Sequence, residues 1–228
     1  MQTYSLKDLT LSNSNFLEDL AISFDTKFTL IQSPNGSGKT SIFNAMRTGS
    51  WIYKGQTGQL TLEFYQNSLD PIYKDLIYLD EKSHNLIQEI LYKRYFRVDA
   101  FLSLLKQNIN NVYGRLRKGL NIEEASDFSS ILFQFSQMGG GEQIILQLFL
   151  IKTLREYIGI SGAVILDAWP LSILDIKYRH LVIEILYSIS DQVIIFEGNW
   201  WCDFPKQFDL TNLNLIHLHG KQPPTSVT

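Results

Sequence analysis

The pattern of apolar and polar positions changes period several times along the chain. Short segments with strand character come first, over Tyr4–Leu11, Leu20–Phe24 and Phe28–Gln32, and turn-forming residues separate them. Leu60–Phe64 alternates apolar and polar residues, the period of a strand with one buried face. Over about 80–120 apolar residues recur at helical spacing, which predicts a helical insertion. We therefore expect the first forty residues to form a sheet edge and the loop that follows it.

The second half of the chain alternates helical and strand patterns. Helices are expected over Gly141–Tyr157 and Ile176–Ser188, and buried strands over Ala163–Leu166 and Val193–Phe196. Strands that alternate with helices indicate a largely parallel sheet. Leu213–Leu218 alternates again and predicts a final edge strand. The fold class is therefore α/β, with a mixed or parallel sheet and flanking helices.

Length and composition predict a single domain over 1–220 and a flexible tail over 221–228. A chain of 228 residues with 45% hydrophobic residues can bury one substantial core. The net charge is −3, so no global positive field attracts nucleic acid, and any DNA contact must be local. A lone Cys202, no signal-like start and no apolar segment of about 20 residues predict a cytoplasmic protein without a membrane partner.

Residues 33–40 carry the strongest chemical signal. They read Ser-Pro-Asn-Gly-Ser-Gly-Lys-Thr between a predicted strand and a predicted helix, which is the context of a phosphate-binding loop. In such a loop Lys39 reaches the β- and γ-phosphates of ATP and the Thr40 hydroxyl binds Mg²⁺. The alternative is a turn rich in glycine and serine that precedes a lysine by chance. The nucleotide-binding residues expected here are Ser33, Asn35, Gly36, Ser37, Gly38, Lys39, Thr40 and Ser41.

The loop departs from the usual pattern at its first position, where Ser33 stands in place of a glycine. A positive φ is costly for serine, so Ser33 must avoid that conformation or adopt another turn. Gly36 and Gly38 allow the backbone to approach a ligand where a Cβ would clash.

A carboxylate ends one of the buried strands. Asp167 follows Ala163–Leu166, as expected for an aspartate that joins the Mg²⁺ shell at the carboxyl end of a parallel strand. It could instead cap the next helix, but the upstream loop favours the metal role. Gln66 and Gln88 are candidates for a glutamine that senses Mg²⁺, and each could equally be a surface residue.

Two further motifs complete a recognisable order. Met138–Gln143 reads Met-Gly-Gly-Gly-Glu-Gln before a long apolar helix, and Ser172–Asp175 follows Asp167. With the loop at 33–40, this order resembles ABC-type ATPases, in which the glycine-rich helix start binds the γ-phosphate held by the opposite protomer. A hinge or a helix-capping loop is the alternative for this segment. The resemblance implies further nucleotide contacts from Gly139, Gly140, Gly141, Glu142 and Asp175.

The N-terminal segment resembles the SMC/RecF class more than transporter ATPases. Leu9–Asn13, a short link, and a strand leading into the Pro-Asn-Gly-Ser-Gly-Lys-Thr loop carry this likeness, and 80–120 stands where SMC proteins place a long coiled coil. The resemblance implies a nucleotide-sandwich dimer with itself or a related ATPase, within a complex that engages DNA or an effector such as a nuclease, in DNA repair or anti-phage defence. A transporter ATPase subunit is the lowest-ranked alternative.

Several positions depart from active family members. Ala168 follows Asp167 where a water-polarising glutamate is expected, and Gly139 replaces the signature serine. Glu197-Gly198-Asn199 follows Val193–Phe196 where a histidine is expected. Glu197 could replace the missing carboxylate or merely cap a turn. We expect ATP hydrolysis to be weak or absent, which favours an ATP-gated sensor over a hydrolysing motor.

Basic residues cluster in and after the predicted insertion. Aromatic residues lie among them, a composition that can contact nucleic acid. A solvated helix face or a protein partner surface is favoured, because the whole chain is slightly acidic. The basic residues are Lys93, Arg94, Arg97, Arg115, Arg117 and Lys118.

Overall fold

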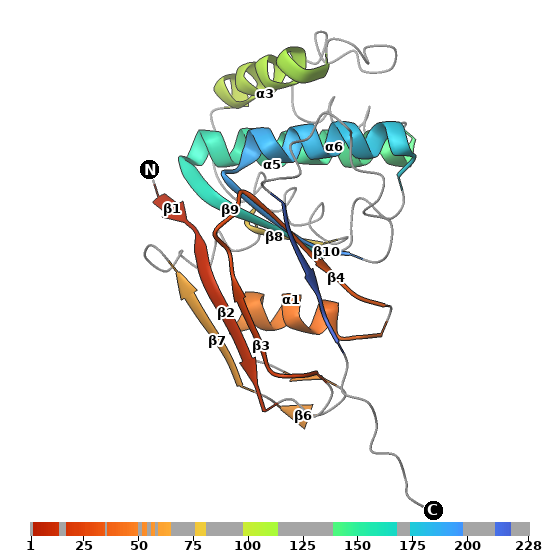
Figure 1. Cartoon of the computed structure of the whole chain (residues 1–228). Coiled ribbons are helices and arrows are strands. Elements are labelled where there is room, and N and C mark those ends of the chain that lie inside the picture. The colour runs from red at the N-terminus through yellow and green to blue at the C-terminus, as the bar shows by residue number, and fades with distance from the viewer. Residues whose placement is uncertain are drawn as a thin grey trace, which may run out of the picture.

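The computed structural model describes residues 2–13, 17–34, 36–49, 52–53, 56–57, 59–64, 76–80, 98–113, 139–167, 174–197 and 213–219. The strands and helices stack in layers (Figure 1). The elements in the first part of the chain are β1 (Gln2–Tyr4), β2 (Leu6–Ser12), β3 (Leu20–Ser23), β4 (Phe28–Gln32), α1 (Lys39–Thr48), β5 (Ile52–Tyr53), β6 (Gln56–Thr57), β7 (Gln59–Phe64) and β8 (Tyr78–Leu79). Those that follow are α3 (Val98–Tyr113), α5 (Gly140–Ile158), β9 (Ile160–Asp167), α6 (Ile176–Ile189), β10 (Gln192–Glu197) and β11 (Leu213–His217).

A parallel sheet forms the centre of the molecule. Its order is β1-β9-β10-β4-β11, with β8 also paired to β9, and each of these pairs is parallel. The central strands β4 and β10 are buried along their whole length, which explains their unbroken apolar character. The predicted parallel sheet is confirmed, and β11 lies at its edge as expected. Because the strands are parallel, β4, β9 and β10 end on the same side.

A second, antiparallel sheet has the order β3-β2-β7. The sheet edge expected in the first forty residues is divided between the two sheets: β1 lies at the edge of the central sheet and β3 at the edge of the antiparallel one. Gln192 at the start of β10 connects the two sheets: its Nε2 donates to the main-chain oxygens of Leu6 (2.7 Å) and Phe24 (3.2 Å), and its Oε1 accepts from Leu6 N (2.9 Å). This amide is buried, so its bonds satisfy main-chain groups that water does not reach.

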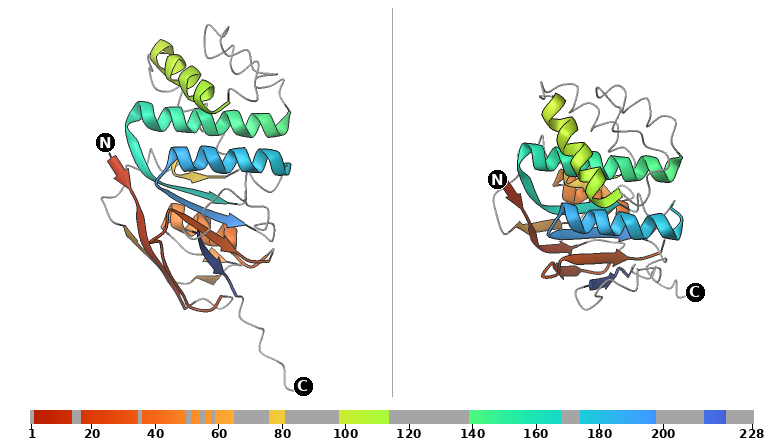
Figure 2. Two further views of the ribbon diagram at one scale, coloured as in Figure 1. Left: turned by 45° about the horizontal axis from the view of Figure 1, so that its top comes forward. Right: turned by 90° about the horizontal axis from the view of Figure 1, so that it is seen from above.

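The central sheet divides the core into two parts, and helices cover each of its faces. Helix α1 lies between the antiparallel sheet and the central sheet (Figure 1), and its apolar face packs with Leu9, Leu11 and Phe196. Helices α5 and α6 cover the other face of the central sheet, and α3 lies outside α5 (Figure 2). The apolar run Ile144–Ile151 of α5, which only Gln147 interrupts, follows from this position, since β9 lies beneath the helix, α6 beside it and α3 over it.

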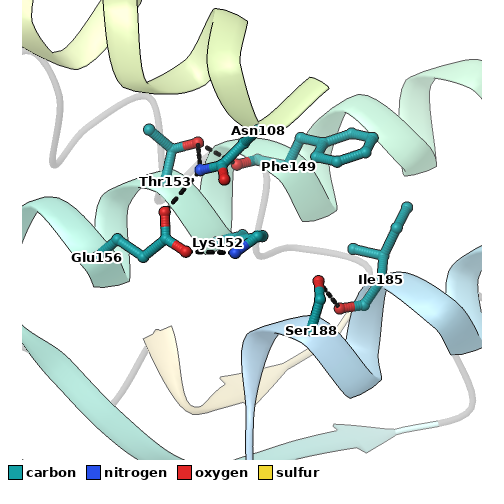
Figure 3. Close-up of polar contacts among 7 residues, drawn as sticks. All are labelled: Asn108, Phe149, Lys152, Thr153, Glu156, Ile185 and Ser188. Carbon is teal, nitrogen blue, oxygen red and sulfur yellow. Dashed lines mark hydrogen bonds and ion pairs between the residues drawn. The ribbon is translucent and has the colours of Figure 1, made fainter. Parts of the chain in front are cut away.

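Helix α3 is fixed to α5 by polar contacts (Figure 3) and by contacts between aromatic rings. The buried Asn108 Nδ2 donates to Thr153 Oγ1 (3.1 Å) and Glu156 Oε2 (2.7 Å). The Phe101 ring meets the Tyr157 ring edge-on at 6.1 Å. Helix α3 falls within the insertion predicted at 80–120, whose remaining residues, like the tail at 221–228, lie outside the described part of the chain.

A buried arginine holds the carboxyl-terminal end of α5. Arg155 is 1% exposed, and its guanidinium donates to the main-chain oxygens of Leu76 (2.9 Å), Ala163 (3.1 Å) and Gly162 (2.9 Å). Burial lowers the pKa of Arg155 to about 10, so it remains charged at neutral pH. These bonds attach α5 to the segment just before β8 and to the first half of β9. In the described ranges, no helix is long and apolar enough to cross a membrane.

Candidate nucleotide-binding site

The phosphate loop joins the end of β4 to the start of α1. Gly36 and Gly38 have φ values of 79° and 97°, the left-handed conformation that glycine adopts without strain. Gly38 caps α1, and its carbonyl accepts from Ile42 N at 2.9 Å. Among the described residues, Asn13 is the one non-glycine with a positive φ. Ser33 therefore avoids the left-handed conformation, which is how a serine fits at the usual glycine position.

The hydroxyl groups of two serines make contact across the phosphate loop. Ser33 Oγ and Ser37 Oγ are in hydrogen-bond contact, and Ser37 N donates to the Pro34 carbonyl at 3.3 Å. The sequence motif gives no sign of this pairing, because the usual loop has no side chain at the Ser33 position. Substituting serine for glycine there therefore adds a contact across the loop.

Lys39 folds back over the loop. Its Nζ donates to the carbonyl oxygens of Ser33 (2.5 Å) and Pro34 (3.0 Å), and the residue is 8% exposed. Burial lowers the pKa of the Lys39 ammonium below its ordinary value, and the negative charges of Glu197 and Asp167 oppose that shift. The ammonium thus lies at the loop, where phosphate oxygens could replace the two carbonyls as its partners.

Thr40 and Asp167 bring two oxygen ligands together. Thr40 Oγ1 donates to Asp167 Oδ1 at 3.2 Å, which joins the first turn of α1 to the end of β9. A hydroxyl and a carboxylate are the ligands that Mg²⁺ takes beside water and phosphate, so these residues fit the metal. No group of three or more His, Cys, Asp or Glu suited to a metal occurs in the described residues. A metal at Thr40 and Asp167 therefore depends on further ligands from the nucleotide and water.

Glu197 ends β10, the strand between β4 and β9. It is 3% exposed, it pairs with Gln32 across the sheet, and the preceding Phe196 pairs with Asp167. Its carbonyl accepts from Ser33 N at 3.4 Å. Side chains alternate along a strand, so Glu197 is on the α5–α6 face with Ile195, whereas Asp167 is on the α1 face with Ile165. The two carboxylates thus reach the loop region from opposite faces, at the same end of the sheet, as the sequence predicted.

The glycine-rich segment forms the start of α5. Gly139 caps the helix, and its N–H donates to Glu142 Oε2 at 3.3 Å. A Cβ added at Gly141 would lie 3.2 Å from Leu174 and 3.3 Å from Tyr178. Close packing thus brings this segment against the start of α6, where Asp175 is exposed and caps the helix. The first N–H groups of α5 have no partners within the helix, as at any helix start.

The structure brings most of the predicted residues to two places. The loop end of the sheet holds Lys39, Thr40 and Asp167 with the loop glycines and serines, and Ser41 follows on α1. The α5–α6 junction holds Gly139–Glu142 and Asp175. The predicted positions outside the described residues are Asn35, Gln66, Gln88, Ala168 and the basic residues Lys93, Arg94, Arg97, Arg115, Arg117 and Lys118.

Comparison with protein families decides the relationship. A family model described as an AAA domain matches residues 8–158, well over half of the chain. The chain belongs to this AAA-domain family. The matched segment of the AAA-domain protein runs from β2 to the end of α5, so it includes the phosphate loop and the glycine-rich helix start.

Solved structures show the fold of the AAA-domain protein. An ATP-binding cassette of an ABC transporter in its ADP conformation aligns with a TM-score of 0.53 and 14% identity, over 96% of this chain and 90% of that one. A nucleotide-free ATP-binding cassette from an ABC transporter aligns with a TM-score of 0.48 and 14% identity, over 96% of this chain and 90% of that one.

An SMC head domain from Thermotoga maritima aligns with a TM-score of 0.46 and 20% identity, over 86% of this chain and 89% of that one. The search of curated proteins found no match to this chain. The predicted ABC-type P-loop ATPase fold, with its parallel sheet and flanking helices, is confirmed.

Proposed function

We propose that the AAA-domain protein binds ATP with Mg²⁺ in the loop between β4 and α1. The observation that carries the proposal is that the Lys39 ammonium and the Thr40–Asp167 pair meet at one end of the parallel sheet. Lys39 would exchange the Ser33 and Pro34 carbonyls for phosphate oxygens. The metal, held by Thr40 and Asp167, would neutralise part of the charge on the β- and γ-phosphates.

The bound nucleotide is proposed to join two ATPase domains. The partner is a second copy of this chain or a related ATPase, whose glycine-rich helix start would face the γ-phosphate. Support comes from the first turn of α5, because Gly139 and Gly140 are exposed there and the first N–H groups of a helix have no partners within it. The packing of Gly141 on Leu174 would hold this turn and the neighbouring Asp175 as one unit.

The assembled pair is proposed to couple its nucleotide state to DNA or to an effector such as a nuclease. Helix α3 supports this role, because it lies in the segment where SMC proteins, which the sequence resembles, would place a long coiled coil, and it is fixed to α5 through Asn108. DNA repair and anti-phage defence are the two settings proposed. A transporter subunit has weaker support, because the N-terminal motifs resemble those of SMC/RecF heads.

The proposal can be tested by ATP binding and association. Calorimetry with Mg²⁺ and ATP is expected to show binding by the wild-type protein, and light scattering should show ATP-dependent dimers or, with a related ATPase, heterodimers. Lys39→Ala should weaken binding about 100-fold, because two charge-assisted hydrogen bonds are lost. Lys7→Ala removes a lysine of the antiparallel sheet and should leave affinity unchanged. No ATP binding by the wild-type protein would contradict the proposal.

Steady-state ATP turnover separates the hydrolysing head from the ATP-gated sensor. The sensor is favoured, because Ala168 can neither orient nor deprotonate water, and Glu197 is the carboxylate beside Asp167 that could replace the missing glutamate. We expect little turnover with or without DNA. Rapid turnover that Glu197→Gln abolishes while ATP-dependent dimers persist would instead establish the hydrolysing head.

A further inference from the structure

The loop end of the sheet carries more negative than positive side-chain charge. Among the described residues of this site, Lys39 contributes one positive charge, and Asp167 and Glu197 contribute two negative charges. A site for a polyphosphate is expected to be positive, because its ligand carries several negative charges. The carboxylate of Glu197, in addition to that of Asp167, would therefore weaken the binding of a polyphosphate to the loop.

Glu197 is placed to act on whatever the loop binds. Its carbonyl accepts from Ser33 N (3.4 Å), and the Ser33 carbonyl in turn accepts from Lys39 Nζ (2.5 Å). The main chain of Glu197 and the lysine ammonium thus contact the same residue of the loop. Burial lowers the pKa of Lys39, and the negative charge of the Glu197 carboxylate raises it against this larger effect. With 3% of its surface exposed, Glu197 is screened by solvent far less than a surface carboxylate would be.

The carboxylates of Asp167 and Glu197 lie on opposite faces of the sheet. Asp167 bonds Thr40 on the α1 face, so a metal held there would offset its charge. Glu197 is on the opposite, α5–α6 face of the sheet, away from that pair. Its charge would therefore act on the phosphates of a bound nucleotide without being one of the two proposed metal ligands.

We propose that Glu197 is a charge-selectivity residue, whose buried carboxylate excludes metal-free polyphosphate from the loop and admits nucleotide only as its complex with a divalent cation. This inference rests on the proposed function. Metal-free ATP adds about four negative charges to a site that is already negative, whereas the Mg²⁺ complex adds about half as many. ADP has one charge fewer than ATP, so the exclusion of metal-free ADP is weaker.

The test measures ATP affinity by calorimetry with excess Mg²⁺ and with EDTA, for the wild-type protein and for Glu197→Gln. The wild-type protein should bind metal-free ATP at least about 100-fold more weakly than Mg²⁺–ATP. In Glu197→Gln, affinity for metal-free ATP should rise about tenfold, the effect of removing one poorly screened charge, while affinity for Mg²⁺–ATP changes less than about threefold. The rise for metal-free ADP should be smaller.

Two further variants make the result specific. Asp167→Asn should also reduce the preference for Mg²⁺–ATP, but by weakening Mg²⁺–ATP binding. Asp99→Asn removes an exposed carboxylate on α3 and should leave both affinities unchanged. The inference is overturned if Glu197→Gln leaves metal-free binding unchanged or shifts both affinities equally. Absence of Mg²⁺–ATP binding by the wild-type protein would instead overturn the proposed function, and the inference with it.

Discussion

At the residue scale, the serine in place of the first loop glycine has a definite structural role. Ser33 keeps an ordinary backbone conformation, and its hydroxyl meets that of Ser37 across the loop. The pair therefore restrains the loop before any ligand arrives. Preorganisation of this kind strengthens binding by lowering the cost of ordering the site.

A double-mutant cycle tests this restraint. Ser33→Ala and Ser37→Ala should each weaken ATP binding about threefold to tenfold, the effect of one lost hydrogen bond, and the double variant should be no weaker than either. Calorimetry provides the affinities, and Ser33→Gly, which restores the usual motif, should bind no more tightly than Ser33→Ala. Additive losses would show that the two hydroxyls act separately.

The sequence was sufficient to identify the chemical groups of the loop but not their contacts. Lys39, Thr40 and Asp167 were predictable, because spacing and strand context determine where they lie. The Ser33–Ser37 contact was not predictable, because the usual motif has glycine at the position of Ser33 and so does not specify where a side chain there would lie. The buried position of Glu197 needed the strand register, which only the folded sheet supplies.

At the element scale, one glycine determines how closely α5 approaches α6. Gly141 lies against Leu174 and Tyr178, whereas a Cβ added at the adjacent Gly140 would meet no atom within 4 Å. Both glycines are in the first turn of the same helix, so they differ in packing rather than in backbone conformation. They form a matched pair for experiment.

Alanine at these two positions should have opposite effects on the free energy of unfolding. Gly141→Ala should lower it by about 1–3 kcal/mol, because the new methyl group crowds Leu174 and Tyr178. Gly140→Ala should raise it by up to about 1 kcal/mol, since alanine favours helix and space is open. Urea denaturation followed by circular dichroism measures both, and equal effects would contradict the packing explanation.

Helix and strand positions were largely predictable from periodicity. The expected strand Phe28–Gln32 is found with those bounds, and the expected helix Gly141–Tyr157 is one residue longer at each end. Periodicity describes local burial but not which strand lies next to which. That is why periodicity did not reveal that β2 and β3 form a separate antiparallel sheet with β7.

At the scale of the whole molecule, the two sheets are joined by hydrogen bonds as well as by their shared core. Gln192 of the central sheet binds Leu6 and Phe24, which lie 186 and 168 positions away, and no local pattern in the sequence marks these contacts. The antiparallel sheet forms one wall of the core around α1. Its attachment therefore affects the helix that carries Lys39 and Thr40.

Loss of the Gln192 amide should loosen the antiparallel sheet. Gln192→Ala leaves the buried Leu6 N–H and the Leu6 and Phe24 carbonyls without their partner, at a cost of about 2–4 kcal/mol in the free energy of unfolding. Hydrogen exchange should accelerate most in β2. Gln59→Ala, at an exposed position of β7, should change stability by less than about 0.5 kcal/mol. Uniform acceleration throughout the chain would contradict a local role.

The three carbonyl bonds of Arg155 have a mechanical consequence. They hold the carboxyl-terminal end of α5, while its amino-terminal end carries the glycine-rich turn. With 19 residues α5 is about 28 Å long, so a tilt of the helix by about 5° about Arg155 would move its amino-terminal turn by about 2.5 Å. A slight rotation of α5 beside β9 would thus displace the glycine-rich turn by about the length of a hydrogen bond. This turn is at the surface where a second ATPase domain is proposed to bind.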